Sequence, residues 1–148
     1  MTRHPDNPGE GDRTIELNER VRRFLDGGPH AVVGASRDRA KYGNKGLRAY
    51  LQNGRKAYPV NPNAEEVEGS KCFPDLAALP ERVHGVSVIT PPEVTESVVA
   101  EAARLGIAHL WLQPGAESEA ALALAGAAGM SVIAGGPCLL VTLRYRER

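Results

Sequence analysis

Short apolar runs alternate with helix-like segments along most of this chain, and this alternation limits the fold more than any other feature. The runs are two to six residues long and rich in β-branched residues, which is typical of buried strands. They lie at residues 31–36, 58–62, 72–73, 86–90, 107–112 and 130–134. Helices of about ten residues between such strands predict parallel strand–helix–strand units with right-handed crossovers.

The segments between the runs carry helical signals. Helices are predicted over residues 44–52, from Glu93 to Leu105 and over 117–128, with a short turn over 76–79 that Asp75 caps. The third of these helices is rich in alanine, and we expect it to be buried. Val94, Val98, Ala102 and Leu105 share one face of the second.

The fold class predicted is therefore α/β: a single doubly wound, mainly parallel, Rossmann-like sheet with helices on both faces. In the order of the six runs, we expect the strand order 3-2-1-4-5-6. The ligand crevice would then lie outside the carboxyl ends of strands 1 and 4, where the order reverses.

The N-terminal region divides into two parts. Residues 1–12 contain almost nothing to bury and are expected to be a flexible tail, so the domain spans residues 13–148. Leu17, Val21, Phe24 and Leu25 fall on one stripe of an N-terminal helix that covers the sheet. Asp12 or Thr14 is the expected cap of this helix.

Composition excludes several classes of protein. The 148 residues suit one domain, and 18 basic residues balance 18 acidic ones, so no overall field attracts nucleic acid or an anionic membrane. No apolar run approaches the roughly 20 residues that cross a bilayer, and the start lacks the apolar core of a signal peptide, so we expect a cytoplasmic protein. Cys72 and Cys138 lack the number and spacing of a disulfide framework or a metal site.

The strongest candidate for a binding site follows the first strand. Gly34 and Ala35 let backbone and ligand approach closely, and Ser36 offers a hydroxyl and an amide. Basic residues follow, among them Arg39 and Lys41, just before the helix predicted near Asn44. A helix N-terminus with added positive charge favours a diphosphate. The spacing is neither GxGxxG nor a P-loop, and a charged surface loop is the alternative interpretation.

The second strand ends in Val60, Asn61 and Pro62. An enzyme that uses NAD usually has an acidic residue near this position to hold the adenosine ribose, whereas Asn61 is neutral. An amide between prolines could border an adenine, although the prolines could equally serve only to end the strand. Other strand ends add Thr90, Pro91, Gln113 and Cys138 to the same rim of the sheet.

The sequence offers no convincing catalytic set. His30 and His84 come just before strands, at the end of the sheet opposite the expected crevice, and His109 lies within a strand. Cys138 has no histidine placed to activate it, so a buried or ligand-adjacent thiol is favoured over a nucleophile.

Taken together, these strand ends resemble the small stand-alone CoA-binding proteins, which are similar to the CoA-binding domain of the succinyl-CoA synthetase α subunit. The resemblance runs from about residue 21 to residue 138. It rests on VVGAS at 32–36, YPVNP at 58–62, EG at 68–69, LPERV at 79–83, VITPP at 88–92 and LWLQPG at 110–115.

The resemblance implies a site for coenzyme A or an acyl-CoA. It places Gly34, Ala35 and Ser36 against the phosphates, with Arg39 and Lys41 as further phosphate partners. It also implies that Val60, Asn61 and Pro62 border the adenosine, that Thr90 and Pro91 line the path of the pantetheine arm, and that Gln113 and Cys138 lie near the crevice.

The chain departs from the family pattern after Cys138, where Leu139 to Thr142 replace the usual acidic or histidine residues. It also stops before the second domain in which the synthetases phosphorylate a histidine, so we expect CoA binding without ligase activity.

Two further hypotheses remain open. Arg37 and Arg39 could accommodate a 2′-phosphate, which makes an NADP-linked oxidoreductase the enzyme alternative. The other is a redox or interaction module, in which Cys138 forms a mixed disulfide with CoA or residues 139–144 pair with a second subunit in a homodimer.

Overall fold

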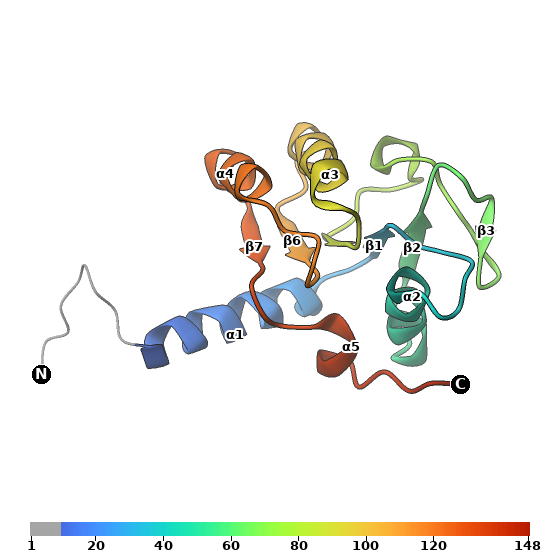
Figure 1. Ribbon diagram of the computed structural model, residues 1–148, viewed down its shortest axis with the longest axis horizontal. Helices are drawn as coiled ribbons and strands as arrows, with labels where there is room; N and C mark the ends of the chain where they lie inside the picture. Colours follow the sequence, from blue (N-terminus) through green and yellow to red (C-terminus); the bar gives the residue numbers. More distant parts are fainter. Residues whose placement is uncertain (1–9) are drawn as a thin grey trace, which may run out of the picture.

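A five-stranded parallel sheet forms the centre of the molecule (Figure 1). The computed structural model describes residues 10–148, with side chains from residue 16 onward. The strand order is β2-β1-β5-β6-β7. The strands are β1 (His30–Val33), β2 (Ala57–Val60), β5 (Gly85–Val88), β6 (His109–Leu112) and β7 (Ser131–Ile133). These are the first, second, fourth, fifth and sixth predicted runs, so the order expected for them is confirmed.

The third predicted strand, over residues 72–73, is shorter than predicted. Phe73 forms only an isolated parallel bridge with Val60, on the outer side of β2. The preceding chain instead forms a two-stranded antiparallel hairpin of β3 (Glu66–Val67) and β4 (Ser70–Lys71). Glu68 and Gly69 turn this hairpin at φ 49° and 78°, so the chain reverses before a longer parallel strand can form.

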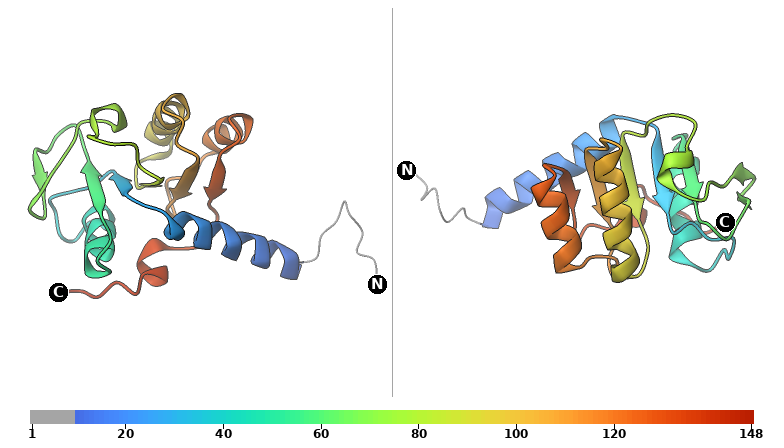
Figure 2. Two further views of the ribbon diagram at one scale, coloured as in Figure 1. Left: turned by 180° about the vertical axis from the view of Figure 1, so that it is seen from behind. Right: turned by 90° about the horizontal axis from the view of Figure 1, so that it is seen from above.

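Helices cover both faces of the sheet, as expected (Figures 1 and 2). α3 (Pro92–Arg104) and α4 (Glu119–Ala127) lie on one face, while α1 (Glu10–Asp26), α2 (Tyr42–Gln52) and α5 (Leu139–Thr142) lie on the other. A 3₁₀ turn, η1 (Leu76–Ala78), is capped by Asp75, which accepts a hydrogen bond from the Ala78 amide as predicted. Among residues 10–148, no helix is both long enough and apolar enough to cross a membrane.

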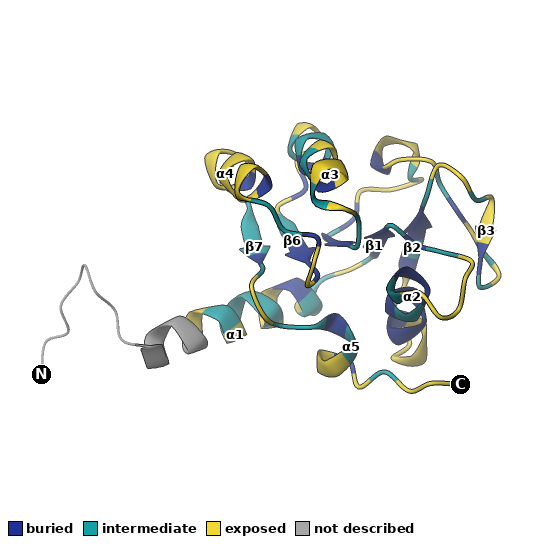
Figure 3. Ribbon diagram, in the orientation of Figure 1, coloured by how far each residue is buried: buried dark blue, intermediate teal, exposed yellow. Residues whose placement is uncertain are grey.

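Alternating strand residues supply a core to each face, and Figure 3 shows the buried ribbon concentrated in the sheet. On the α3–α4 face, Val86, Val88, Leu110 and Leu112 pack against helix residues that include Val99, Ala102, Ala121 and Ala125. On the other face, Val32, Trp111 and Ile133 pack against residues that include Phe24, Leu47, Tyr50 and Leu139. Two apolar layers therefore fix the sheet and the positions of its strand ends.

Three helix predictions need correction. α1 begins at Glu10, so Asp12 and Thr14 lie inside the helix rather than at its cap, and residues 1–9 of the predicted tail lie outside the described residues. Val94 is 44% exposed because it lies in the first turn of α3, beyond the edge of the sheet. α4 buries only Ala121 and Ala125, since its leucines face solvent.

The segment proposed to pair with a second subunit packs against its own chain instead. Leu139 and Leu143 are buried in the core beneath α2, and Val141 is the large apolar residue left exposed there. The prediction that residues 139–144 form a subunit contact is therefore wrong for the two leucines. A homodimer through another surface stays a prediction.

His30, His84 and His109 lie at the amino end of the sheet, opposite the strand ends of interest, which was expected for the first two. His84 stacks on His109 with ring centroids 4.4 Å apart, and His30 lies edge-on to His84 at 5.9 Å. The Nε2 atoms of His30 and His84 contact the carbonyl oxygens of Phe24 and Arg23 at 2.7 and 2.8 Å, at the end of α1. This cluster was not foreseen, because the three residues are far apart in sequence.

α1 also contacts β7, the strand at one edge of the sheet. The Nη1 atom of Arg20 donates to the carbonyl oxygen of Val132 in β7 at 3.0 Å. At its carboxyl end, Phe24 packs over Gly85, where an added Cβ would lie 2.6 Å from the ring. The helix therefore contacts both the central strand β5 and the edge strand β7.

Candidate functional site

A cavity of about 400 Å³ opens at the carboxyl ends of β1, β2 and β5. It lies in the predicted crevice, and its lining residues are Gly34, Ala35, Ser36, Lys41, Tyr42, Gly43, Asn61 and Ile89. Larger surface hollows lie elsewhere. One is lined by Glu65, Glu66 and Glu68, whose carboxylates disfavour an anionic ligand.

Two glycines bring the walls of this cavity together. Gly34 has φ +95°, and a Cβ there would lie 2.0 Å from the carbonyl oxygen of Ile89. A Cβ on Gly43 would lie 2.0 Å from the carbonyl oxygen of Gly34. Any larger residue would have to move backbone, so the close approach of β1, β5 and α2 depends on these glycines.

The loop between β1 and α2 turns its carbonyl groups into the protein. The Asn61 Nδ2 atom donates to the carbonyl oxygen of Ala35 at 2.7 Å, and its Oδ1 atom accepts from the Asn63 amide at 2.8 Å. Among the described residues, the amides of Ala35, Ser36 and Arg37 have no hydrogen-bond partner. The loop therefore presents donors, which suits an anion.

The amino end of α2 adds to this donor character. Lys41 occupies the cap position, its side chain makes no capping bond, and the first turn contains no acidic residue. The helix dipole and its unpaired amides therefore favour a negative charge at the cavity. Ser36 lines the cavity, and its Oγ atom accepts a hydrogen bond from the Asp38 amide at 3.1 Å.

The two arginines of the loop, Arg37 and Arg39, do not line the cavity. Arg39 is paired with the carboxylate of Glu68 and also donates to the carbonyl oxygen of Arg148. The Glu68 carboxyl has a pKa below its usual range because Asn44 and Arg39 donate to it. Arg37 borders the acidic hollow. Of the basic residues named from sequence, only Lys41 lines the cavity.

The remaining strand ends lie beside the cavity. A Cβ on Gly34 would lie 3.2 Å from the Thr90 methyl, so Thr90 adjoins the first glycine of the loop. The Thr90 hydroxyl is bonded to the Thr95 hydroxyl at 2.8 Å, and Pro91 caps α3. Val60 is buried, its carbonyl oxygen accepts from the Gly34 amide at 3.1 Å, and Pro62 follows Asn61.

Gln113 and Cys138 meet through a residue that sequence reasoning missed. The Tyr42 hydroxyl donates to Gln113 Oε1 at 2.7 Å and lies 2.6 Å from Cys138 Sγ. Burial raises the pKa of the Tyr42 hydroxyl, so this tyrosine stays protonated. The buried Nε2 atom of Gln113 has no partner among the described residues. The sequence offered one signal for Tyr42, an aromatic hydroxyl directly before Gly43. It offered no signal for Ile89, another lining residue that was missed.

The site offers donors and one mobile cation but no obvious acid–base machinery. No carboxylate or imidazole side chain lines the cavity. Within the described residues, no group of three or more His, Cys, Asp or Glu side chains is placed to hold a metal ion. A Rossmann-like sheet with a donor-rich first loop defines a nucleotide-binding class of domain.

Comparison with known proteins gives the family. Residues 30–144 match the CoA binding domain family, and the chain belongs to that family. It is 39% identical over 79 residues to acetate–CoA ligase (ADP-forming) II of Archaeoglobus fulgidus, and 34% identical over 80 residues to the α subunit of the Pyrococcus furiosus enzyme. These matches cover 52% of this chain but only 12% and 17% of those proteins, so the chain corresponds to a small part of them.

Solved structures of similar size match over more of their length. A conserved hypothetical protein from Pyrococcus furiosus is 42% identical with a TM-score of 0.72, covering 76% of this chain and 97% of that one. A hypothetical protein from Pyrococcus horikoshii is 28% identical with a TM-score of 0.77, covering 95% and 94%. The fold is thus shared with single-domain proteins as well as with parts of larger enzymes.

Proposed function

We propose that this protein binds coenzyme A or an acyl-CoA at the carboxyl ends of its parallel strands, with no catalysis of its own. The diphosphate would occupy the cavity between the β1–α2 loop and the start of α2. The adenosine would lie beside Val60 and Pro62, and the pantetheine arm would run past Thr90 and Pro91. Gln113 and Cys138 would be nearest to the far end of that arm.

The observation that carries this proposal is the donor-rich loop in a chain of the CoA-binding family. The residues Ala35 and Ser36, whose amides are free, border a cavity that also receives the uncapped end of α2, and the free amide of Arg37 follows them in the loop. Lys41 supplies a positive charge at its rim, and hydrogen bonds to a charged phosphate are worth about 1.5–3 kcal/mol each.

The end of β2 lacks the usual partners of a nicotinamide nucleotide. The 2′-phosphate of NADP is commonly met by an arginine there, yet Arg39 is paired with Glu68 and Arg37 borders three glutamates, and the 3′-phosphate of CoA would likewise need a cation from elsewhere. NAD would need an acceptor for its ribose hydroxyls at Asn61, and both polar atoms of that side chain are already bonded. The neutral end of β2 thus supports the interpretation made from the sequence.

Absence of catalysis is proposed from the chemistry of the lining. No carboxylate or imidazole lines the cavity, and Cys138 lies against a tyrosine hydroxyl rather than an imidazole. The relatives named as acetate–CoA ligases are several times longer than the matched region, so their reaction is not transferred to this chain.

Calorimetric titration tests the proposal. CoA should bind more tightly than NADPH or NADH, and equal or stronger binding of either nicotinamide nucleotide would contradict it. Ser36→Asp places a negative charge at the phosphate position and should weaken CoA binding at least about tenfold. Ser118→Asp is the matched control, because Ser118 caps α4 and does not line the cavity, and aspartate is an equally good cap.

A further inference from the structure

Two side chains of α2 reach back to the β1–α2 loop and bind its carbonyl oxygens. The Asn44 Nδ2 atom donates to the Ser36 carbonyl at 2.9 Å, and the Arg48 Nη2 atom donates to the Arg39 carbonyl at 2.7 Å. The two side chains are themselves joined, because Arg48 Nε donates to Asn44 Oδ1 at 2.6 Å. One turn of α2 therefore holds the loop at two points, Ser36 and Arg39.

Arg48 is an unusual residue for this position. It lies on the buried face of α2, and its side chain is only 6% exposed. The nearest carboxylate oxygen, on Glu147, is 3.8 Å away and belongs to a side chain that is 65% exposed. Since burying a poorly neutralised cation is costly, an apolar residue would serve packing better. The guanidinium group instead donates hydrogen bonds to three acceptors: Asn44 Oδ1, the Arg39 carbonyl oxygen and, at 3.2 Å, the Arg148 carbonyl oxygen.

The direction of the loop amides follows from these contacts. In a trans peptide the carbonyl of one residue and the amide of the next point in opposite directions. Asn61 holds the carbonyl of Ala35 and Asn44 holds that of Ser36, so the amides of Ser36 and Arg37 point away from the side-chain nitrogens that hold these carbonyls. These are two of the amides without a partner in the described part of the chain.

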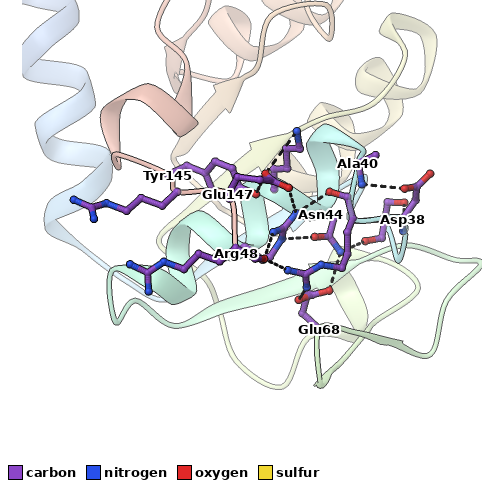
Figure 4. A network of polar contacts seen from close by, with 12 residues as sticks. Asp38, Ala40, Asn44, Arg48, Glu68, Tyr145 and Glu147 are labelled. Atoms are coloured by element: carbon purple, nitrogen blue, oxygen red, sulfur yellow. Dashed lines mark hydrogen bonds and ion pairs between the residues drawn. The ribbon is translucent and has the colours of Figure 1, made fainter.

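The network continues beyond the loop, as Figure 4 shows. Asn44 also donates to Glu68 Oε2 at 3.1 Å, and Glu68 pairs with Arg39, which ties the β3–β4 turn to the loop. Arg48 carries the network to the segment around Tyr145 and Glu147. Asn44, Arg48 and Glu68 thus hold the loop without lining the cavity.

We propose that Asn44 and Arg48 are positioning residues, which set the β1–α2 loop so that its amides bind the phosphate groups of the ligand. They act through the loop carbonyls and do not touch the ligand. This inference rests on the proposed function, because it assigns the diphosphate to that loop.

The test compares ligands with and without a diphosphate. Binding of CoA, ADP and adenosine is measured by calorimetry for the unaltered protein and for Arg48→Met and Asn44→Ala. CoA and ADP affinity should fall by a similar factor of at least about tenfold, since the loop amides are no longer held in place to bind the diphosphate, whereas adenosine affinity should stay within about twofold. Gln52→Ala is the matched control: it removes two hydrogen bonds between α2 and Arg146 at the far end of the helix and should leave all three affinities unchanged.

Arg48→Lys provides a second variant if Arg48→Met does not fold. It keeps the charge but not the fork, so CoA affinity should remain reduced. Equal losses for all three ligands would indicate general loosening and would overturn the inference, as would full CoA affinity in Asn44→Ala or Arg48→Lys. If the unaltered protein does not bind CoA, the proposed function itself fails, which is a different result from a variant that binds normally.

Discussion

His30 should make the stability of this protein fall steeply in mild acid. The residue opens β1, is 1% exposed, and lies between the rings of Phe24 and Tyr50 at centroid distances of 4.8 and 5.2 Å. Burial lowers the pKa of His30 from 6.5 to about 4, helped by the charges of His84 and Arg55. In the unfolded chain the imidazole keeps its ordinary pKa.

The sign and size of the effect follow from proton linkage. Between pH 6.5 and 4 the unfolded chain binds a proton that the folded protein rejects, so stability is lost as the pH falls through this window. The full gap is worth about 3 kcal/mol at 1.36 kcal/mol per pH unit, and about 2.5 kcal/mol of it is lost by pH 4.5. The pKa of His109 is lowered in the same direction by burial and adds to the loss.

Urea unfolding between pH 8 and pH 4.5 measures this effect in the unaltered protein and in His30→Gln. The glutamine removes the titration and keeps a donor for the Phe24 carbonyl, so its free energy of unfolding should fall by about 2.5 kcal/mol less over this range. His84→Gln, at a less buried site in the same cluster, should keep the steep dependence. The reasoning is refuted if His30→Gln loses as much stability as the unaltered protein.

Three further substitutions test the site and its support. Gly43→Ala would place a Cβ 2.0 Å from the Gly34 carbonyl oxygen, so α2 must shift away from the loop; calorimetry should show at least a tenfold loss of CoA affinity, and an unchanged affinity would show that the close approach is unnecessary. Asn61→Asp replaces a donor by a carboxylate facing a carbonyl, and it should weaken CoA binding several-fold more than Asn61→Ala; equal effects would argue against a positioning role for the amide. Tyr50→Phe removes a buried 2.6 Å hydrogen bond to the Ser87 hydroxyl, so chemical denaturation should show a loss of about 1–2 kcal/mol while CoA affinity stays the same.

The sequence was most informative where structure is local. Apolar runs bounded by glycine or proline marked all five strands of the parallel sheet, and their alternation with helices indicated a doubly wound sheet, whose usual strand order these five strands have. The cap at Asp75 was found because the capping residue and its partner amide are three residues apart. The weak run at Cys72 and Phe73 gave the right neighbour, β2, but only Phe73 pairs with it.

A cavity lies at the strand ends where the sequence predicted a crevice, but the side-chain contacts around it were not predicted. Asn61 was expected beside the ligand; it lines the cavity and also holds a loop carbonyl, while Arg39, expected at a phosphate, pairs with Glu68. Tyr42 was missed although it joins Gln113 to Cys138. These partners come from segments brought together only by the fold, and nothing in the local pattern around any one of them specifies the contact.

The position of α1 has a consequence for how the protein is made. α1 precedes every strand of the sheet in the chain, yet it rests partly on β7, the last strand, through the bond between Arg20 and the Val132 carbonyl. Until β7 leaves the ribosome, Arg20 lacks this strand carbonyl, although Phe24 can already dock on Gly85. The helix is therefore expected to settle in two stages during synthesis, first over the centre of the sheet and then, with the last strand in place, against its β7 edge.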